Sequence, residues 1–259
     1  MSAAQILGLD HVVIAVHDLE VAITSYRGLG FTVQPGGRHA GRTSHNALIV
    51  FADGAYIELI AWVAPAPQER WWRVLQADGE GYVDFALLPR DTMAVLEAAR
   101  GRGLHTLIGP VDGGRVRPDG AQLHWRTARH ATPDVPFLCG DLTPRSLRVP
   151  EGEARHHANG AQGVAELSIA VDDLDATVAR YEALLGAHAG IEVQEPGTQT
   201  PRAVFTVGTT RFVLTPAAAS STRGQGVTGM RLAGLQSVLP LQSTHGALIE
   251  DQTRADRVR

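Results

Sequence analysis

The chain contains a single cysteine, few aromatic residues and no long hydrophobic run. Because Cys139 is alone among 259 residues, neither an intrachain disulfide nor a zinc site built from several cysteines is expected. No stretch approaches the roughly 20 apolar residues that span a membrane, and the first residues lack the basic and apolar regions of a signal peptide. We therefore expect a protein of the reducing cytoplasm, with Cys139 as a buried, inert thiol.

The chain also lacks an excess of positive charge. Its formal net charge is -4, with 44% hydrophobic and 19% charged residues. Without a basic surface, binding to nucleic acid or to an anionic membrane is not expected. The length and the ordinary globular composition suit one large or two medium domains. The expected partner is a small-molecule substrate or ligand, or another protein.

The sequence repeats itself. Leu-Asp-His-Val-Val-Ile-Ala-Val-His-Asp-Leu near the start is echoed by Glu-Leu-Ser-Ile-Ala-Val-Asp-Asp-Leu far downstream. Placing His11 over Glu166 superimposes Asp18 on Asp173 without a gap. A histidine and a carboxylate thus occupy one structural position in two copies of one unit, which makes them the first candidates for binding a metal or a substrate.

Each copy has the same order of predicted elements. A short apolar run predicts a buried strand, an aspartate then caps a helix, and three further strands follow. Such β-α-β-β-β units are expected at about 9–61, 82–139 and 164–214, and strand character returns without a helix at 230–241. A unit of this kind leaves a curved, half-open sheet, so the units must pair and enclose a cleft.

The predicted fold class is α+β, with three βαβββ modules and a partial fourth that pair into two half-open barrels. We expect residues 1–143 to form the first pair of modules and residues 144–160 to cross to the second body. Residues 161–241 would hold the third module with the truncated fourth, and residues 242–259 a polar tail. Which modules face one another is left open by the sequence.

Several blocks carry a family resemblance, and they run from about Leu9 to about Thr215. They are the opening histidine run, Gly30-Phe-Thr-Val-Gln-Pro-Gly-Gly-Arg-His, Asn46, Asp53-Gly-Ala-Tyr-Ile-Glu-Leu-Ile, Arg115-Val-Arg-Pro-Asp-Gly with Trp125, and His157-Ala-Asn-Gly. In this order they resemble the vicinal oxygen chelate superfamily, and within it the multi-module glyoxalase-like proteins of bacteria. The resemblance implies a glyoxalase/dioxygenase-like fold with its site at the mouth of the paired sheets.

The resemblance also implies a divalent ion, Fe, Mn, Zn, Ni or Co, held by the first and last strands of a module. His11 and Glu58 occupy those places. Strand alternation puts both on apolar, inward faces, where an unpaired carboxylate would be costly. If the first and third modules face one another, Glu166 becomes a third ligand. If the first faces the second, only two ligands remain.

Four further residues are candidates for binding a substrate. Asn46 and its neighbour His45 precede a strand, where each is either a substrate contact or a loop residue. Arg117 lies with Arg115 in a Gly-Gly-Arg-Val-Arg-Pro-Asp-Gly loop, which either binds a substrate carboxylate or phosphate or is simply solvated. The resemblance implies that Arg117 orients the substrate, with Trp125 as an apolar wall. We place His39 on a surface turn rather than in the site.

The leading functional hypothesis is a metal-assisted enzyme of the lyase, isomerase or dioxygenase type acting on a small oxygenated metabolite. In it, His11 and Glu58 are both catalytic residues and metal ligands. The fold does not choose among these reactions. The alternative is a metal-free protein that binds or sequesters a drug or metabolite in the same cleft. An interaction module built on Trp62, Trp71 and Trp72, whose contact would join two copies in a homodimer, ranks last.

Overall fold

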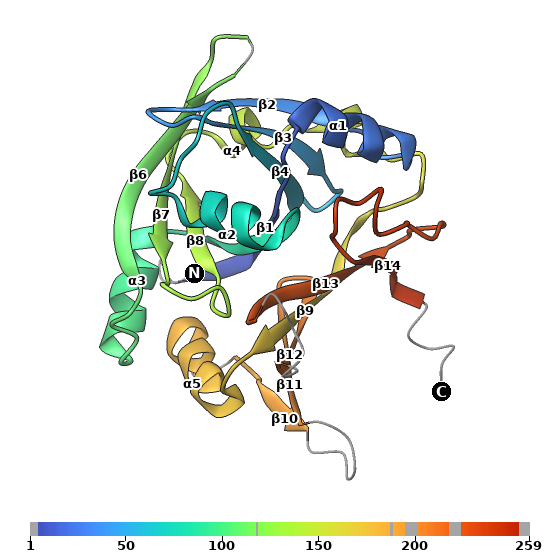
Figure 1. Cartoon of the computed structure of the whole chain (residues 1–259). Helices are drawn as coiled ribbons and strands as arrows, with labels where there is room; N and C mark the ends of the chain where they lie inside the picture. Colours follow the sequence, from blue (N-terminus) through green and yellow to red (C-terminus); the bar gives the residue numbers. More distant parts are fainter. Residues whose placement is uncertain (1–4, 118, 187–188, 195–200, 218–223, 254–259) are drawn as a thin grey trace.

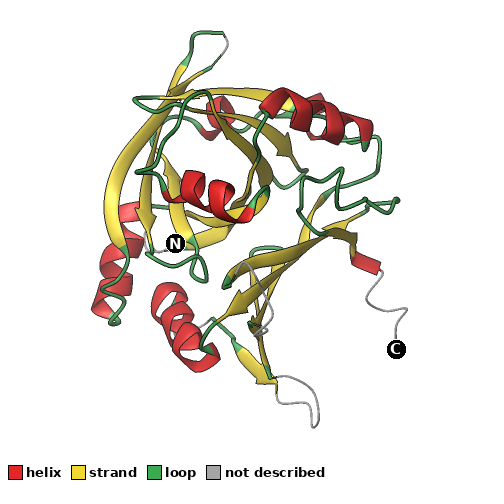
Figure 2. Cartoon of the chain, viewed as in Figure 1, coloured by secondary structure: helices red, strands yellow, loops and turns green. Residues whose placement is uncertain are grey.

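The computed structural model describes residues 5–117, 119–186, 189–194, 201–217 and 224–253. These residues form a closed eight-stranded barrel and an open six-stranded sheet beside it (Figure 1). Few helices accompany the strands (Figure 2). In the described part of the chain, no helix is both long and apolar enough to cross a membrane.

The first two modules close the barrel together. Its strand order is β1-β4-β3-β2-β6-β7-β8-β5, and the two modules join where β1 pairs with β5 and where β2 pairs with β6. The first module therefore faces the second and not the third. The elements of the two modules are β1 (Ile6–Ala15), α1 (Leu19–Gly28), β2 (Gln34–His39), β3 (Ser44–Val50), β4 (Tyr56–Trp62), α2 (Arg70–Asp78), β5 (Gly81–Pro89), α3 (Thr92–Gly101), β6 (Ile108–Val116), β7 (Gln122–Arg129) and β8 (Phe137–Asp141).

The third module keeps the same element order, but only two further strands extend its sheet. Its sheet runs β10-β11-β12-β9-β13-β14 and stays open. The α+β fold of repeated modules is thus confirmed, although one pair closes fully and the other is a single sheet. The remaining elements are α4 (Arg145–Arg148), a 3-10 turn (Gly152–Arg155), β9 (Gly163–Val171), α5 (Leu174–Leu185), β10 (Glu192–Gln194), β11 (Arg202–Val207), β12 (Thr210–Pro216), β13 (Gly226–Ala233) and β14 (Ile249–Asp251).

The three predicted helix caps explain why each module turns from its first strand into a helix. The side chains of Asp18, Asp91 and Asp173 each accept hydrogen bonds from backbone amides of the first turn. The amide nitrogens of Glu20 and Met93, for example, lie 2.9 Å and 2.8 Å from the capping oxygens. Such bonds satisfy donors that the helix itself leaves free.

Two elements differ from the sequence-based expectation because they contain glycine and proline. Pro35-Gly-Gly, a sequence typical of a turn, lies inside β2, which accommodates it through an irregularity between Pro35 and Gly37. The predicted loop around Arg115 is the end of the long strand β6, paired with β7 over almost its whole length. Helix α2 was not predicted because it follows a proline-rich connector. Part of the predicted tail forms β14, and residues 254–259 lie outside the described residues.

The open sheet docks on the barrel through the tyrosines that the repeat superimposes. The Tyr26 hydroxyl donates to the carbonyl oxygen of Thr244 (3.0 Å), which ties α1 to the C-terminal segment. The Tyr181 hydroxyl donates to the carbonyl oxygen of Asp134 (2.9 Å), which ties α5 to the loop between β7 and β8. The buried Asp134 carboxylate also accepts from Arg180 at 2.5 Å. Equivalent residues of two modules therefore make equivalent docking contacts.

We predict that Asp134→Asn lowers the free energy of unfolding by about 2 kcal/mol at neutral pH, because Arg180 loses its carboxylate partner. Although burial raises the pKa of Asp134, hydrogen bonds and the charge of Arg180 lower it below its ordinary value. The lowered pKa means that the carboxylate stabilises the fold above the ordinary carboxyl pKa and loses this effect as the pH falls. Urea unfolding should show a gap between wild type and variant that narrows below about pH 4. Glu182→Gln, an exposed change on the same helix, should leave stability unaltered at neutral pH; equal stability of Asp134→Asn and wild type would contradict the docking role.

Candidate functional site

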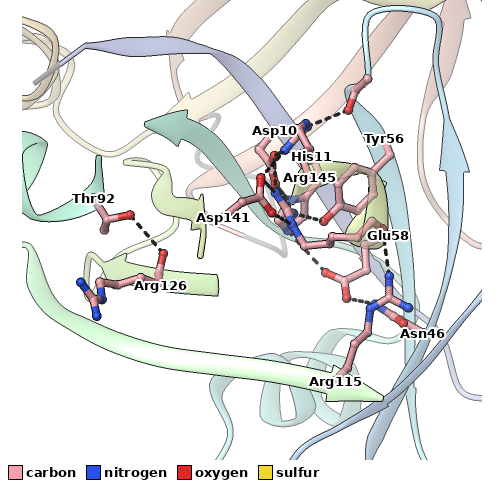
Figure 3. A network of polar contacts seen from close by, with 12 residues as sticks. Asp10, His11, Asn46, Tyr56, Glu58, Thr92, Arg115, Arg126, Asp141 and Arg145 are labelled. Atoms are coloured by element: carbon pink, nitrogen blue, oxygen red, sulfur yellow. Dashed lines mark hydrogen bonds and ion pairs between the residues drawn. The ribbon is translucent and has the colours of Figure 1, made fainter. Parts of the chain in front are cut away.

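The barrel encloses a cavity of about 110 Å³ between the first and second modules. It is smaller than the roughly 150 Å³ cavity that holds a benzene molecule in another protein, so it can enclose only a small ligand or part of a larger one. The close view in Figure 3 shows the polar contacts on one side of this cavity. Its lining includes His11, His39, Asn46, Tyr56, Glu58, Trp71, Arg115, Trp125, Arg129, Phe137, Cys139 and Arg148.

His11 and Glu58 meet in this cavity. They stand on inward faces of the parallel neighbours β1 and β4, and both are buried. The atoms His11 Nε2 and Glu58 Oε2 lie 3.5 Å apart. The His11 ring stacks on Tyr56 with 4.6 Å between centroids and meets the edge of Phe137 at 5.3 Å. Packing on two sides therefore fixes the plane of the imidazole and aims Nε2 at the carboxylate.

Asp10 determines which nitrogen of His11 faces the cavity. His11 Nδ1 lies 2.6 Å from Asp10 Oδ2, and both side chains are buried (Figure 3). Burial alone would raise the pKa of Asp10, but the guanidinium groups of Arg148 and Arg145 hold it well below its ordinary value. An ionised Asp10 can only accept, so Nδ1 carries the proton and donates it. His11 Nε2 is left facing Glu58.

Arg148 and Arg145, both on α4, hold Asp10 in place. Arg148 donates to the two Asp10 oxygens at 2.7 and 2.9 Å, and Arg145 donates to one of them at 2.6 Å. Arg148 also donates to the Tyr56 hydroxyl (2.7 Å) and, through Nε, to Asp141 (2.5 Å). The sequence gives no local signal for this network, because Asp10 and Arg148 are 138 positions apart.

Each carboxylate oxygen of Glu58 faces one imidazole. His39 Nε2 lies 3.5 Å from Oε1, and the Asn46 side-chain amide donates to the same oxygen at 2.6 Å. Burial raises the pKa of Glu58, but hydrogen bonds and charge from His39, His11 and Asn46 outweigh it and lower that pKa to about 2. The prediction that His39 lies on a surface turn is wrong, because β2 continues to it and Ser44 Oγ contacts its Nδ1 at 3.0 Å.

The residues predicted to bind substrate divide between two locations. Asn46 and Trp125 line the cavity. His45 is the neighbour of Asn46 on β3, where side chains alternate between faces, and it does not line the cavity. Arg117 lies beyond the end of β6, where it contacts the Leu147 carbonyl oxygen at 3.2 Å outside the cavity. The placement of Arg117 in the site is therefore corrected.

Arg115 enters the cavity in place of Arg117. It lies two residues earlier, within β6 and buried, whereas the chain has begun to turn at Arg117. Its guanidinium donates to the carbonyl oxygens of Gly36 and Arg148, the latter at 3.0 Å. Bound to two backbone carbonyls, Arg115 forms a wall of the cavity and joins α4 to β2.

Glu166 does not meet His11 and Glu58. It stands on β9 of the open sheet, and its carboxylate accepts from Arg211 at 2.5 Å and from Arg231 at 2.7 Å. The expectation that Glu166 completes a metal site required the first and third modules to face one another, and the structure pairs the first with the second. Two guanidinium groups satisfy this carboxylate instead of a metal.

The donor chemistry of the cavity fits a divalent cation only on the His11, Glu58 and His39 side. In the part of the chain that the structure describes, Asp10, His11 and Cys139 are the one trio whose ligand atoms lie within 4.8 Å of one another. That trio does not suit a cation, since Asp10 is held by two guanidinium groups and burial raises the pKa of the Cys139 thiol to about 12. By contrast, His11 Nε2 faces the ionised Glu58 directly. Their 3.5 Å separation is close to the roughly 3.4 Å between two ligands at about 2.1 Å in a tetrahedral site.

Comparisons with known proteins agree with this fold. A family model described as a glyoxalase-like domain matches residues 9–185, more than half of the chain, so the chain belongs to this family. The resemblance to the vicinal oxygen chelate superfamily is confirmed. Among curated proteins, none matches the sequence.

Solved structures share the fold at low sequence identity. A hypothetical protein from Staphylococcus aureus has 14% identity and a TM-score of 0.71, with 93% of this chain and 97% of that chain covered. A mutant of 4-hydroxymandelate synthase from Streptomyces coelicolor has 14% identity and a TM-score of 0.60, with 88% and 71% covered. A fusion of a xylose isomerase-like TIM barrel with a 4-hydroxyphenylpyruvate dioxygenase has 21% identity and a TM-score of 0.57, and this chain, 90% covered, spans 37% of it.

We predict that Arg148→Gln destabilises the fold by about 3 kcal/mol. The change removes two charged hydrogen bonds from the buried Asp10 and leaves Arg145 as its cationic partner. Arg145→Gln is the matched control, since the Arg145 side chain is 27% exposed and Asp10 retains both bonds from Arg148. Its cost should be about 1 kcal/mol or less. Denaturant unfolding of both variants measures the difference, and a smaller loss for Arg148→Gln than for Arg145→Gln would contradict the assigned order.

Proposed function

We propose that this protein is a metal-assisted enzyme that acts on a small oxygenated metabolite bound in the barrel cavity. His11, Glu58 and His39 would hold the divalent ion. The observation that carries the proposal is the meeting of two kinds of metal ligand in the cavity, since His11 Nε2 lies 3.5 Å from an oxygen of the ionised Glu58 while its Nδ1 contacts Asp10. This spacing is close to that of two ligands of one ion.

A proton shared between His11 and Glu58 is the competing explanation for the gap. A charge-assisted hydrogen bond between such groups is usually about 2.7–2.9 Å long, whereas the atoms lie 3.5 Å apart. The hydrogen bond from Nδ1 to Asp10 is also the contact that metal-ligating histidines usually make with their second nitrogen. The contact with Asp10 favours a metal, whereas the 3.5 Å distance also fits an ion pair between an imidazolium and a carboxylate.

His39 would supply a third donor after a shift of its side chain, because the ligand atoms of His11, His39 and Glu58 do not all lie within 4.8 Å of one another among the described residues. Ser44 fixes its Nδ1, so its Nε2 faces the carboxylate oxygen that His11 does not approach. Two imidazoles and one carboxylate are the donors of non-haem iron oxygenases. The two neighbours whose titles name an activity are a 4-hydroxyphenylpyruvate dioxygenase fusion and 4-hydroxymandelate synthase. Among the lyase, isomerase and dioxygenase reactions, these observations favour the dioxygenase type, with iron as the metal.

The residues around this site have separate roles. When bound, the ion would polarise an oxygen of the substrate and bring it next to its reaction partner. Asp10 keeps the proton of His11 on Nδ1, and Tyr56 and Phe137 hold the ring. Asn46 fixes one oxygen of Glu58. The closed barrel limits the entry of water, which strengthens electrostatic interactions inside it.

The second candidate is a metal-free protein that binds a small molecule in the same cavity. It is favoured by the second module, which offers no ligand opposite His11 and Glu58. Asp84, at the same spacing from its helix cap as His11, is already bonded to Trp71 at 2.8 Å and to Arg70. Phe137, next to it on the inward face of β8, is apolar.

Metal analysis separates the two candidates. We predict that protein reconstituted without oxygen in Fe, Mn, Zn, Ni or Co binds about one ion per chain, measured by elemental analysis after gel filtration. His11→Ala, Glu58→Gln and His39→Ala should each weaken binding about tenfold or more, because each removes a donor. His45→Ala is the matched control on the other face of β3 and should bind as wild type does. Less than stoichiometric metal in all five reconstitutions, or unchanged binding in His11→Ala, would favour the metal-free candidate.

A further inference from the structure

The cavity contains a second polar group, Arg129, whose position the proposed roles of His11 and Glu58 do not explain. Arg129, the last residue of β7, lines the inner cavity. It also lines an outer hollow of about 520 Å³, together with Arg42 and Trp71. The three residues common to both spaces mark the mouth through which the cavity meets the outside. Arg129 is half-buried there.

The guanidinium of Arg129 is fixed in position but not hydrogen-bonded. Its carbon lies 4.1 Å from the centroid of the Phe137 ring and 4.6 Å from that of Trp71. Such contacts hold the planar group over aromatic rings and leave its N–H donors free. Among the described residues, no acceptor takes a hydrogen bond from this side chain, and its one ion-pair partner is Asp84 at 3.8 Å.

The nearby carboxylates are already occupied. Asp84 accepts from Trp71 Nε1 at 2.8 Å and from Arg70. Glu69 accepts from Trp62 Nε1 at 3.0 Å and pairs with Arg42 at 3.7 Å. The mouth of the cavity thus holds three guanidinium groups against two carboxylates. The excess positive charge lies on Arg129, whose donors have no acceptor.

We propose that Arg129 binds the carboxylate of the substrate, which is therefore a small organic acid. A planar guanidinium with free parallel N–H groups suits a carboxylate bidentately. The body of the acid would lie beside Trp125 and Phe137, and an oxygen at its other end would face His11 and Glu58. This assignment rests on the proposed function for the reacting end of the substrate. The carboxylate site itself requires no metal.

Binding of matched acids and amides tests the assignment. Pyruvate, lactate, benzoate and mandelate are titrated against their primary amides at constant ionic strength, with the fluorescence of Trp71 and Trp125 as the signal. In wild type, at least one acid should bind about tenfold more tightly than its amide, the usual order for a charge-assisted pair. Arg129→Gln should abolish this preference, and Arg129→Lys, which keeps the charge without the fork, should retain part of it.

The control is Arg73→Gln, an equal change of charge on the exposed side of α2, outside both spaces. It should keep the preference of wild type. Circular dichroism confirms that each variant is folded. No preference for any acid over its amide, or an unchanged preference in Arg129→Gln, would overturn the proposal. Inorganic phosphate that binds more tightly than every acid would overturn the choice of a carboxylate.

Repeating the titrations in His11→Ala and in metal-depleted protein keeps the two proposals distinguishable. A preference for acids that survives in both supports the Arg129 site even where no metal binds, so that failure of the metal proposal does not remove it. A metal that binds stoichiometrically without any preference for acids would instead sustain the proposed function and overturn the role of Arg129.

Discussion

The buried ion cluster around Asp10 is the interaction on which the site depends. A carboxylate with no exposed surface is stable only when cations and donors surround it. Arg148 and Arg145 supply them from α4, which follows the last strand of the barrel. The cluster therefore joins the first strand of the chain to the segment that leaves the barrel, and at the same time it fixes the proton of His11. Stability and the chemistry of the cavity are coupled through one carboxylate.

The same pairing with arginine recurs at four of the five buried carboxylates among the described residues. The 23 basic residues are all arginine, since the chain contains no lysine. Asp10, Asp84, Asp134 and Glu166 are each paired with at least one guanidinium. Arginine stays charged and offers several donors in one plane, so it satisfies both oxygens of a buried carboxylate better than lysine does. Glu58 differs from these four, because its described partners are two imidazoles and an amide.

Most of the fold was predictable because its signals are local. The helix caps at Asp18, Asp91 and Asp173 and the alternation that turns His11 and Glu58 inward each depend on a few neighbouring residues. The closing of the barrel was not predictable, since it depends on pairing between distant strands. Strand β6 was missed for the same reason, because its glycine and proline residues indicate a loop unless the partner strand is known.

Only those residues of the site that a local sequence pattern identifies were predicted. Alternation identified His11 and Glu58, but Asp10, Arg145 and Arg148 come together from opposite ends of the barrel sequence. His39 was misplaced because Pro35 and the glycines after it indicated a turn where β2 in fact continues. Arg117 was preferred through the family resemblance, and the segment was taken as a loop, whereas β6 extends to Val116 and places Arg115 inside the barrel. In both places a strand extends through residues typical of turns, and the extent of a strand decides which side chain points inward.

The two modules of the barrel give the cavity opposite electrical ends. At the same spacing from the helix cap, the first module has His11 and the second has Asp84. On the first side, the ionised Glu58 faces two imidazoles, which under the proposed function would share a cation with it. On the second side, Arg70 and Trp71 satisfy Asp84, and among the described residues Arg129 donates no hydrogen bond, which suits the anion proposed to bind there. The two copies of one unit thus place different charges at equivalent positions, and a cavity with such ends would favour one orientation of an asymmetric acid.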